Sequence, residues 1–309
     1  MHGEKSWFRR VRLMVSAAAM IATVAPARAQ QIAFTWDDLP AHSALPPGET
    51  RVEIGRKLIA AMKEAHLPPV YGFLNGILTE EEPLSTPMLK DWREAGLQLG
   101  NHTWSHMNLN QHSLAEWEAD TLRNEALLKS YMGSDDWHWL RYPNLAEGDT
   151  LEKREGARKF LAEHGYKIAG VTMSFGDYLY NGPYARCVAK NDAASVAQLE
   201  ASYLAAADAT IDYTRSMSKA LYGRDIPYVL LMHVGALDAR MLPRLLKLYR
   251  DKGFSFISLQ DAEKDPFYKN DLDLSLPPVP DTLEEAMRTH NLALPPRPAP
   301  TVDLNTICK

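Results

Sequence analysis

The sequence FTWDDLP, from Phe34 to Pro40, places two acidic residues side by side at the end of an apolar, β-rich run. Neighbouring residues on a strand point to opposite faces of the sheet. A surface turn tolerates such a pair of carboxylates. A site in which Asp37 and Asp38 have different roles requires it.

Apolar runs rich in β-forming residues alternate with segments of helical periodicity along the rest of the chain. The expected strands are Gln31–Trp36, Val70–Leu74, Leu97–Gly100, Trp139–Tyr142, Ile168–Met173, Tyr228–Met232 and Phe254–Leu259. The expected helices are Arg51–Ala65, Ser113–Tyr131, Thr150–His164, Ser195–Leu221 and Ala239–Lys252. This alternation predicts an α/β fold with a parallel sheet, either a closed or nearly closed barrel or an open doubly wound sheet. No GxGxxG turn follows the first strand, which disfavours dinucleotide binding.

The first 29 residues have the pattern of a secretory signal peptide. Basic residues at positions 5, 9, 10 and 12 precede an apolar run, residues 13–24, that is too short to span a bilayer. Ala27-Arg28-Ala29 then matches a cleavage site, so we expect a periplasmic or secreted protein; an uncleaved membrane anchor is the alternative. The formal net charge of −5 becomes more negative without this basic segment, which excludes nucleic acid as the expected partner. No other apolar stretch is long enough for stable membrane insertion.

The remaining chain is predicted to form one large domain and a tail. Residues 30–264 are enough for a full hydrophobic core. Residues 265–309 are rich in proline, with one helical candidate near Thr282–His290, and are expected to form an extended tail on the surface. Cys187 and Cys308 would pair in an oxidising compartment and fix this tail, or remain free thiols, because spacing alone does not show proximity.

Polar residues of functional interest lie where the expected strands end. Functional residues of parallel α/β folds gather at such ends. The candidates are Asp37, Asp38, His102, His106, Arg141, Asp177 and His233. The four-residue spacing of the two histidines in NHTWSH lets their imidazoles converge if the segment turns helically. Two imidazoles and a carboxylate suit zinc or a similar divalent ion and leave a position open for water; two surface histidines are the alternative.

Five motifs resemble those of polysaccharide deacetylases of the NodB-homology type, carbohydrate esterase family 4. They are FTWDDLP, NHTWSH, RYPN, SFGDYLYN and LLMHVG, in this order across residues 31–260. The resemblance implies a distorted (β/α) barrel of about seven parallel strands, with residues 30–264 as the catalytic domain. It also implies a divalent metal, most often zinc, with cobalt, nickel or manganese as alternatives.

The resemblance also implies roles for the acidic residues and the two histidines of the second motif. By motif position, Asp38, His102 and His106 are the metal ligands, and Asp37 is the general base that deprotonates the water. The loop Tyr142–Asn144 is expected to supply a backbone N–H for the oxyanion. The motif here reads RYPN instead of the commoner Arg-Pro-Pro-Tyr, which leaves the donor open.

The remaining motif positions imply supporting roles. His233 matches the general acid that protonates the departing amine, Asp177 the carboxylate that supports it, and Arg141 the cation that braces Asp37. Each residue also has an alternative interpretation. His233 could be a core histidine whose hydrogen bonds are satisfied, Asp177 a turn residue, and Arg141 part of a surface salt bridge. Leu231 lines the acetyl pocket or simply packs in the core.

Four aromatic residues and one more histidine lie near these motifs in the sequence. The aromatic residues either form a platform for sugar rings or make ordinary packing contacts; they are Trp104, Tyr142, Tyr178 and Tyr180. Tyr178 stands where the family typically has tryptophan. His42 follows the first motif closely, and we interpret it as an ordinary loop residue, with a place at the rim of the site as the alternative.

The sequence therefore predicts a metal-dependent hydrolase that removes acetyl groups from N-acetylated poly- or oligosaccharides, acting on a non-peptide carbon–nitrogen bond. One alternative is a hydrolase of another amide or of an O-acetyl ester on the same fold. The other is a non-catalytic carbohydrate-binding relative. The sequence does not indicate the sugar, the metal or the oligomeric state.

Overall fold

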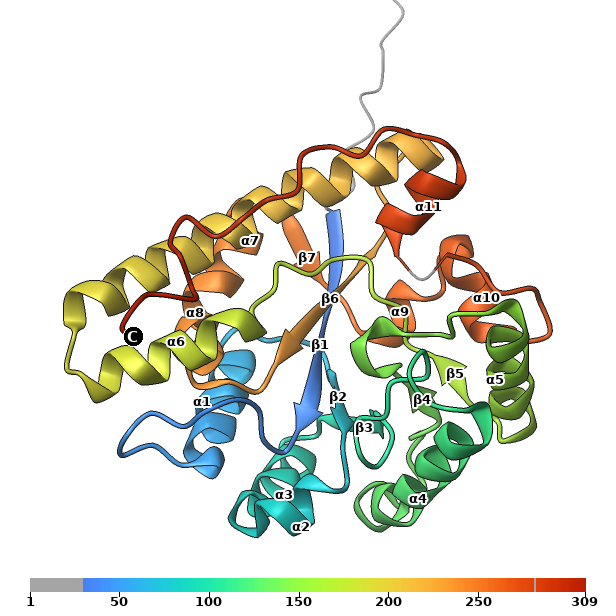
Figure 1. Ribbon diagram of the computed structural model, residues 1–309, viewed down its shortest axis with the longest axis horizontal. Helices are drawn as coiled ribbons and strands as arrows, with labels where there is room; N and C mark the ends of the chain where they lie inside the picture. The colour runs from blue at the N-terminus through green and yellow to red at the C-terminus, as the bar shows by residue number, and fades with distance from the viewer. Residues whose placement is uncertain (1–29, 281) are drawn as a thin grey trace, which may run out of the picture.

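The computed structural model describes residues 30–280 and 282–309, and the predicted signal peptide lies outside the described residues. Strands occupy the centre of the molecule and helices surround them (Figure 1). The strands are β1 (Gln30–Leu39), β2 (Tyr71–Leu74), β3 (Gln98–Asn101), β4 (Trp139–Leu140), β5 (Lys167–Ile168), β6 (Tyr228–His233) and β7 (Phe254–Phe256). The α-helices are α1 (Arg51–Glu64), α2 (Leu78–Glu81), α3 (Pro87–Glu94), α4 (Leu114–Met132), α5 (Leu151–Glu163), α6 (Tyr178–Ala189), α7 (Ala193–Tyr222), α8 (Ala236–Asp251), α9 (Leu259–Ala262), α10 (Lys269–Leu272) and α11 (Leu283–Thr289). Short 3-10 turns cover Pro83–Ser85, Pro143–Leu145 and Pro266–Tyr268.

The seven strands form one parallel sheet that curls into a half-barrel. Their order is β5-β4-β3-β2-β1-β6, and β7 pairs with the first residues of β1. Beyond β5, the chain leaves β4 and approaches the other edge of the sheet. There the N–H groups of Thr172 and Met173 donate to the carbonyl of Val229, and Leu231 N–H donates to the carbonyl of Met173. The barrel expectation is confirmed, and the expected strand Ile168–Met173 is divided between two edges of the sheet.

The two faces of β1 contact different hydrophobic clusters. Phe34 and Trp36 lie in the larger cluster between the sheet and the helices, whereas Ala33 lies in a smaller cluster inside the barrel. Thr35 and Asp37 follow the same alternation as Ala33 and point inward. The inward face of β1 therefore becomes polar toward its carboxyl end, where the site is expected.

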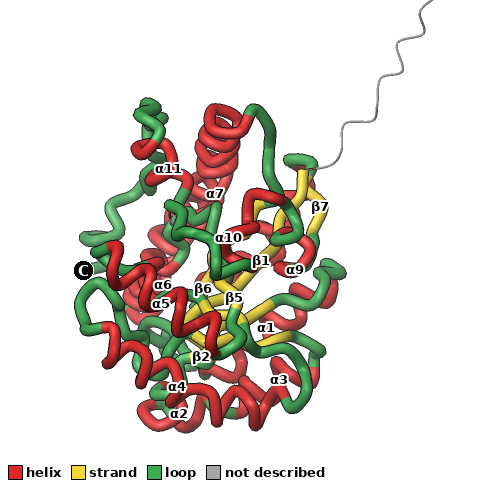
Figure 2. The backbone as a smooth tube through the Cα atoms, turned by 90° about the vertical axis from the view of Figure 1, so that its right-hand side faces the viewer, coloured by secondary structure: helices red, strands yellow, loops and turns green. Residues whose placement is uncertain are grey.

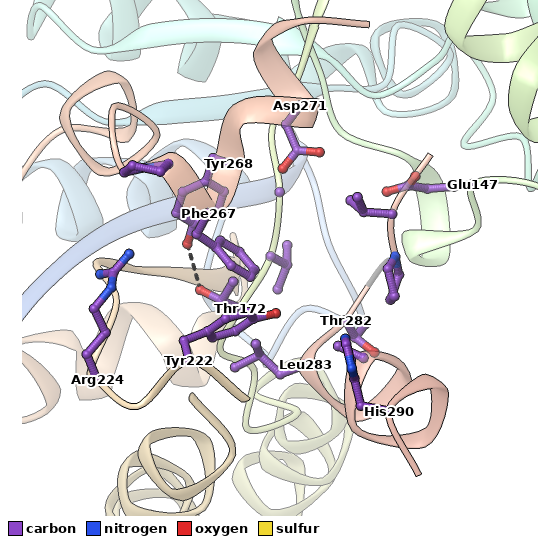
Figure 3. Close-up of a pocket in the computed structure, with 16 residues that line it drawn as sticks. Glu147, Thr172, Tyr222, Arg224, Phe267, Tyr268, Asp271, Thr282, Leu283 and His290 are labelled. Carbon is purple, nitrogen blue, oxygen red and sulfur yellow. Dashed lines mark hydrogen bonds between the residues drawn. The ribbon is translucent and has the colours of Figure 1, made fainter. Parts of the chain in front are cut away.

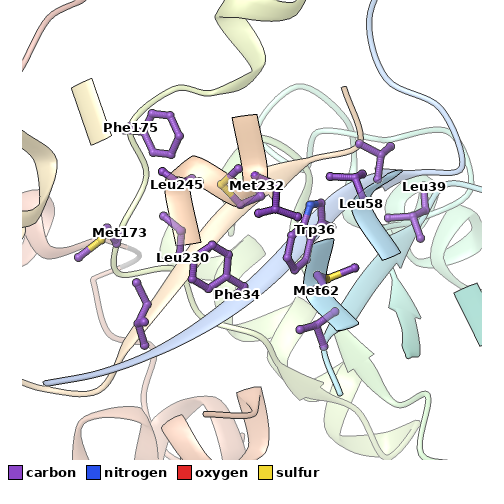
Figure 4. Packing of buried hydrophobic residues seen from close by; sticks show 14 of the residues in the cluster. Phe34, Trp36, Leu39, Leu58, Met62, Met173, Phe175, Leu230, Met232 and Leu245 are labelled. Atoms are coloured by element: carbon purple, nitrogen blue, oxygen red, sulfur yellow. The ribbon is translucent and has the colours of Figure 1, made fainter. Parts of the chain in front are cut away.

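The larger cluster fixes the position of β1 between its neighbours. Figure 4 shows Phe34 and Trp36 among Leu58 and Met62 of α1 and Leu245 of α8. All five side chains are buried. Burying a side chain of this size contributes about 1.5–3 kcal/mol.

Helix α6 was not predicted from the sequence. It contains Gly182 and Pro183, which have low helix propensity and obscure its periodicity. Its N-cap residue is Asp177, so the helix begins at a predicted site residue. The five expected helices are confirmed, with boundaries that shift by at most three residues.

The C-terminal tail is attached to the body of the protein along α7. In Figure 1 the red trace follows α7 from α11 toward α6, and Figure 2 shows α11 beside one end of α7. Thr301 N–H donates to Ser202 Oγ over 2.9 Å, and a disulfide joins Cys187 of α6 to Cys308. The pairing left open by the sequence is thus present. Across residues 30–280 and 282–309, we find no helix with the length and apolar character needed to cross a membrane.

We expect the Cys187→Ser/Cys308→Ser variant to lose about 2–5 kcal/mol of unfolding free energy, because a bridge across 121 residues restricts the unfolded chain. Urea unfolding of the variant and the wild type measures this loss. Unchanged stability of the wild type after full reduction would show that the bridge does not stabilise the fold.

Candidate metal centre and active site

At the carboxyl end of β1, the side chains of Asp37 and Asp38 both lie near His102. Asp37 is in register with His233 of β6. Asp38 has a φ of 62°, in the left-handed region that aspartate tolerates better than most residues, and the register with β2 shifts between Trp36 and Leu39. As a result, His102 Nε2 lies 3.6 Å from an oxygen of Asp37 and 3.6 Å from an oxygen of Asp38.

Asp38, His102 and His106 form a candidate metal site. Asp38 Oδ1 lies 3.6 Å from His102 Nε2 and 3.5 Å from His106 Nε2, and one donor atom from each residue lies within 4.8 Å of the others. Tetrahedral zinc ligands are separated by about 3.4 Å, so this set is close to the spacing of such a site. Asp38 Oδ1 is buried and accepts no hydrogen bond from the described residues. A buried carboxylate oxygen without a donor is unfavourable, so the site fits a cation.

His102 is held in the form that a metal ligand requires. Its Nδ1 lies 2.7 Å from the backbone carbonyl of Arg141, so Nδ1–H donates to that oxygen and Nε2 keeps its lone pair facing Asp38. Burial lowers the pKa of His102 to about 4. The imidazole is therefore neutral near pH 7, as binding a cation demands.

Arg141 is buried beneath Asp37 and contacts three elements. Its Nη1 donates to Asp37 Oδ1 over 3.1 Å, its Nη2 to Thr35 Oγ1 over 3.0 Å, and its Nε to the carbonyl of Ala169 over 2.7 Å. The guanidinium also lies over the ring of Phe73, 4.6 Å from its centroid. A surface salt bridge is excluded for Arg141, whose side chain is 1 % exposed. These contacts hold the Asp37 carboxylate in one orientation.

His233 and Asp177 form a second buried pair opposite the candidate metal site. Asp177 accepts from His233 N–H over 2.7 Å, and its Oδ1 lies 3.1 Å from His233 Nδ1. Burial lowers the pKa of His233, but the Asp177 carboxylate outweighs it, and the pKa rises to about 10. His233 Nε2 faces the cleft, 4.0 Å from Asp38 Oδ2. Asp177 is therefore buried, which excludes an exposed turn aspartate. His233 lines the cleft and is not enclosed in the hydrophobic core.

His42 belongs to this cluster, so the interpretation of it as an ordinary loop residue is wrong. Its Nδ1 lies 2.9 Å from Asp38 Oδ2, and its ring is 4.8 Å from that of His233. Burial raises the pKa of Asp38, but the hydrogen bond with His42 and the nearby histidines outweigh burial and lower it. The four-residue spacing between Asp38 and His42, the same as between His102 and His106, was the signal that could have identified it.

The four aromatic candidates separate into packing residues and one exposed ring. Trp104, Tyr142 and Tyr180 are buried, whereas Tyr178 is 45 % exposed. The Tyr178 ring lies 5.2 Å from that of His233, at the wall of the cleft. Of the four aromatic candidates, only Tyr178 is exposed enough to contact a sugar ring.

The candidate site opens into a cleft of about 890 Å³, in the upper part of the range of small-molecule pockets. The metal-site residues, His42 and His233 line this cleft. Asn144 of the expected oxyanion loop and Leu231, expected in the acetyl pocket or the core, also line it. Another wall of the cleft is formed by residues of α7, α11 and the tail. The residues of this wall are Ala206, Thr210, Tyr213, Thr214, Thr282, Glu284, Arg288, Arg297, Pro298, Ala299 and Pro300.

A second cavity of about 510 Å³ lies on the other side of α11. Figure 3 shows Tyr268 and Phe267 on one side of it and Thr282 on the other, with Thr172 hydrogen-bonded to Tyr268. None of the described residues that line it is a predicted site residue. The predicted site residues Asp37, Asp38, His102, His106 and His233 line the larger cleft instead.

Comparison with known proteins agrees with this geometry. The model of the polysaccharide deacetylase family matches residues 25–169. No curated protein sequence matches the chain.

Solved structures share the fold at low sequence identity. The chitin deacetylase of the fungal pathogen Colletotrichum lindemuthianum is 18% identical, with 76% of this chain and 88% of that chain covered and a TM-score of 0.52. A mutant of BA3943, a family-4 pseudoenzyme with restored activity, is 14% identical, with 76% and 68% covered and a TM-score of 0.52. In its sequence match and in its half-barrel of parallel strands, the chain resembles the polysaccharide deacetylases of carbohydrate esterase family 4, as its motifs predict.

Proposed function

We propose that the protein is a metal-dependent deacetylase of N-acetylated oligo- or polysaccharides. The observation that carries this proposal is the convergence of a carboxylate and two imidazoles beside a second carboxylate that is paired with a buried arginine. The family match and the deacetylases among the solved structures support a deacetylase function.

Asp38, His102 and His106 would hold the metal. A divalent cation, most often zinc in such a donor set, would polarise the acetyl carbonyl and lower the pKa of a water molecule. His42 orients the Asp38 carboxylate, because its contact with Oδ2 leaves Oδ1 directed at the two imidazoles. Cobalt, nickel and manganese also accept these donors.

Asp37 acts as the general base in this proposal. The Arg141 guanidinium holds Oδ1, while Oδ2 remains near the metal site, 3.6 Å from His102 Nε2. A carboxylate in this position can take the proton of the attacking water. Its orientation is fixed before substrate arrives, since Arg141 is itself held by Thr35 and Ala169.

His233 acts as the general acid. Asp177 holds Nδ1, so Nε2–H faces the cleft and can donate to the nitrogen of the departing amine. For the oxyanion we assign the backbone N–H of Asn144, which lines the cleft with a φ of 57°. Tyr142 is buried, and Pro143 has no N–H to donate.

We further propose that the protein acts in the periplasm or outside the cell. The signal-like pattern of residues 1–29 supports this location, and so does the disulfide, since such bonds persist in oxidising compartments.

Isothermal calorimetry with zinc should detect one site per chain in the wild type. We expect His102→Ala to weaken zinc binding by more than about 100-fold, because loss of even an outer partner of a metal ligand costs about 10–100-fold. His112→Ala removes an exposed histidine and serves as the control. Equal zinc affinity of His102→Ala and the control would contradict the assigned site.

An acetate-release assay on chitooligosaccharides, peptidoglycan fragments and acetylated xylan should show activity that a chelator abolishes and zinc restores. We expect Asp37→Asn to lower turnover by about 10²–10⁴-fold, the usual contribution of a general base, while zinc affinity is retained. Glu94→Gln, on an exposed face of α3, is the control. Full turnover by Asp37→Asn, or by the wild type after verified metal removal, would refute the mechanism; release only from xylan would support an O-acetyl esterase.

A further inference from the structure

Two arginines of the C-terminal segment line the same cleft as the candidate metal site. Arg288 belongs to α11 and Arg297 to the proline-rich segment that follows it, and both side chains line the cleft. Both residues are exposed, and no carboxylate of a described residue forms an ion pair with either. The protein as a whole has a formal net charge of −5, and these two residues place positive charge on the lining of the cleft.

Both arginines lie near Tyr213 of α7 on the wall of the cleft. Burial raises the pKa of Tyr213 on α7, the adjacent Glu284 raises it further, and Arg297 and Arg288 oppose this shift. The four side chains therefore form one group on the cleft wall, with two cations and one carboxylate. The two cations outnumber the one carboxylate, so one positive charge remains for a group that enters the cleft.

Interaction with a helix dipole accounts for the position of only one of the two arginines. Arg288 lies in the last turn of α11, where a cation interacts favourably with the helix dipole. Arg297 lies outside any helix, within the sequence LPPRPAP of residues 294–300. Proline restricts the backbone on both sides of it, which limits the positions that the guanidinium can reach.

The segment that carries the arginines is anchored at both ends. On one side, α11 buries Leu283, Ala286 and Met287. On the other, Thr301 bonds to Ser202 only four residues after Arg297, and the disulfide follows at Cys308. The arginines are therefore held over the cleft by fixed structure.

Taken with the deacetylase function proposed above, on which this inference rests, the geometry points to an acidic substrate. We propose that Arg288 and Arg297 bind a carboxylate of the oligosaccharide, so that the enzyme prefers chains in which sugars with an acid group accompany the N-acetylated sugar. Planar guanidinium groups match carboxylates in paired, charge-assisted hydrogen bonds, which favours this anion.

The test compares two oligosaccharides that differ only in charge. One alternates N-acetylglucosamine with glucuronic acid, and the other is the same molecule after its carboxyl groups are reduced to alcohols. Calorimetry on the zinc-loaded full chain should show binding of the acidic form about tenfold or more tighter, as expected for hydrogen bonds to a charged group. In Arg288→Gln/Arg297→Gln the ratio of the two affinities should fall to about one.

Arg56→Gln/Lys159→Gln is the matched control, because it removes two cations from α1 and α5 without touching the cleft lining. This variant should keep the wild-type affinity ratio. An equal ratio in the arginine variant and the wild type, or preference of the wild type for the reduced form, would overturn the proposal. Stronger binding of a sulfated chitooligosaccharide than of the carboxylated chain would also overturn it, since the site would then be selective for sulfate.

Acetate release from the same oligosaccharides separates the two proposals. Selective binding without acetate release from any acetylated sugar would leave the acidic subsite standing and refute the deacetylase. Acetate release with no effect of charge would refute the subsite alone.

Discussion

The buried ion pair between Asp37 and Arg141 connects the end of β1 to the segment after β4, and the organisation of the site depends on it. Both side chains are almost fully inaccessible to solvent, and the two atoms that pair are 3.1 Å apart. Burying two charges costs free energy that a salt bridge rarely returns in full, so such a pair contributes little to stability by itself. Its effect here is positional: Arg141 also supplies the carbonyl that orients His102, so one residue aligns both the base and a candidate ligand.

The local backbone of Asp38 gives the adjacent carboxylates different roles. Regular alternation would direct Asp38 toward the helices and away from Asp37. The left-handed conformation at Asp38 and the shifted register with β2 interrupt this alternation and bring its oxygens to the two imidazoles. Asp37 stays on the inward face with Arg141. Two neighbouring residues thereby reach one centre by different backbone geometries, and Oδ1 of Asp38 is buried there without a hydrogen-bond donor among the described residues.

Features that follow from strand periodicity could be predicted from the sequence, and features set by tertiary contacts could not. The seven strands were predictable, and so was the gathering of His102, His106, Arg141 and His233, because parallel strands end at one edge of the sheet. Helix α6 was missed since Gly182 and Pro183 mask its period. The contact of His42 with Asp38 depends on the turn after β1. The wall that the tail contributes to the cleft could not be foreseen, because a proline-rich segment carries no periodicity that shows where it packs.

We expect one cation to bind between Asp38 and the two histidines of the second motif. A crystal structure of the zinc-loaded protein, with anomalous data collected at the zinc absorption edge, tests this binding site directly. One strong anomalous peak should lie about 2.0–2.2 Å from Asp38 Oδ1, His102 Nε2 and His106 Nε2. A peak elsewhere, or zinc bound at this place without one of these three atoms, would contradict it.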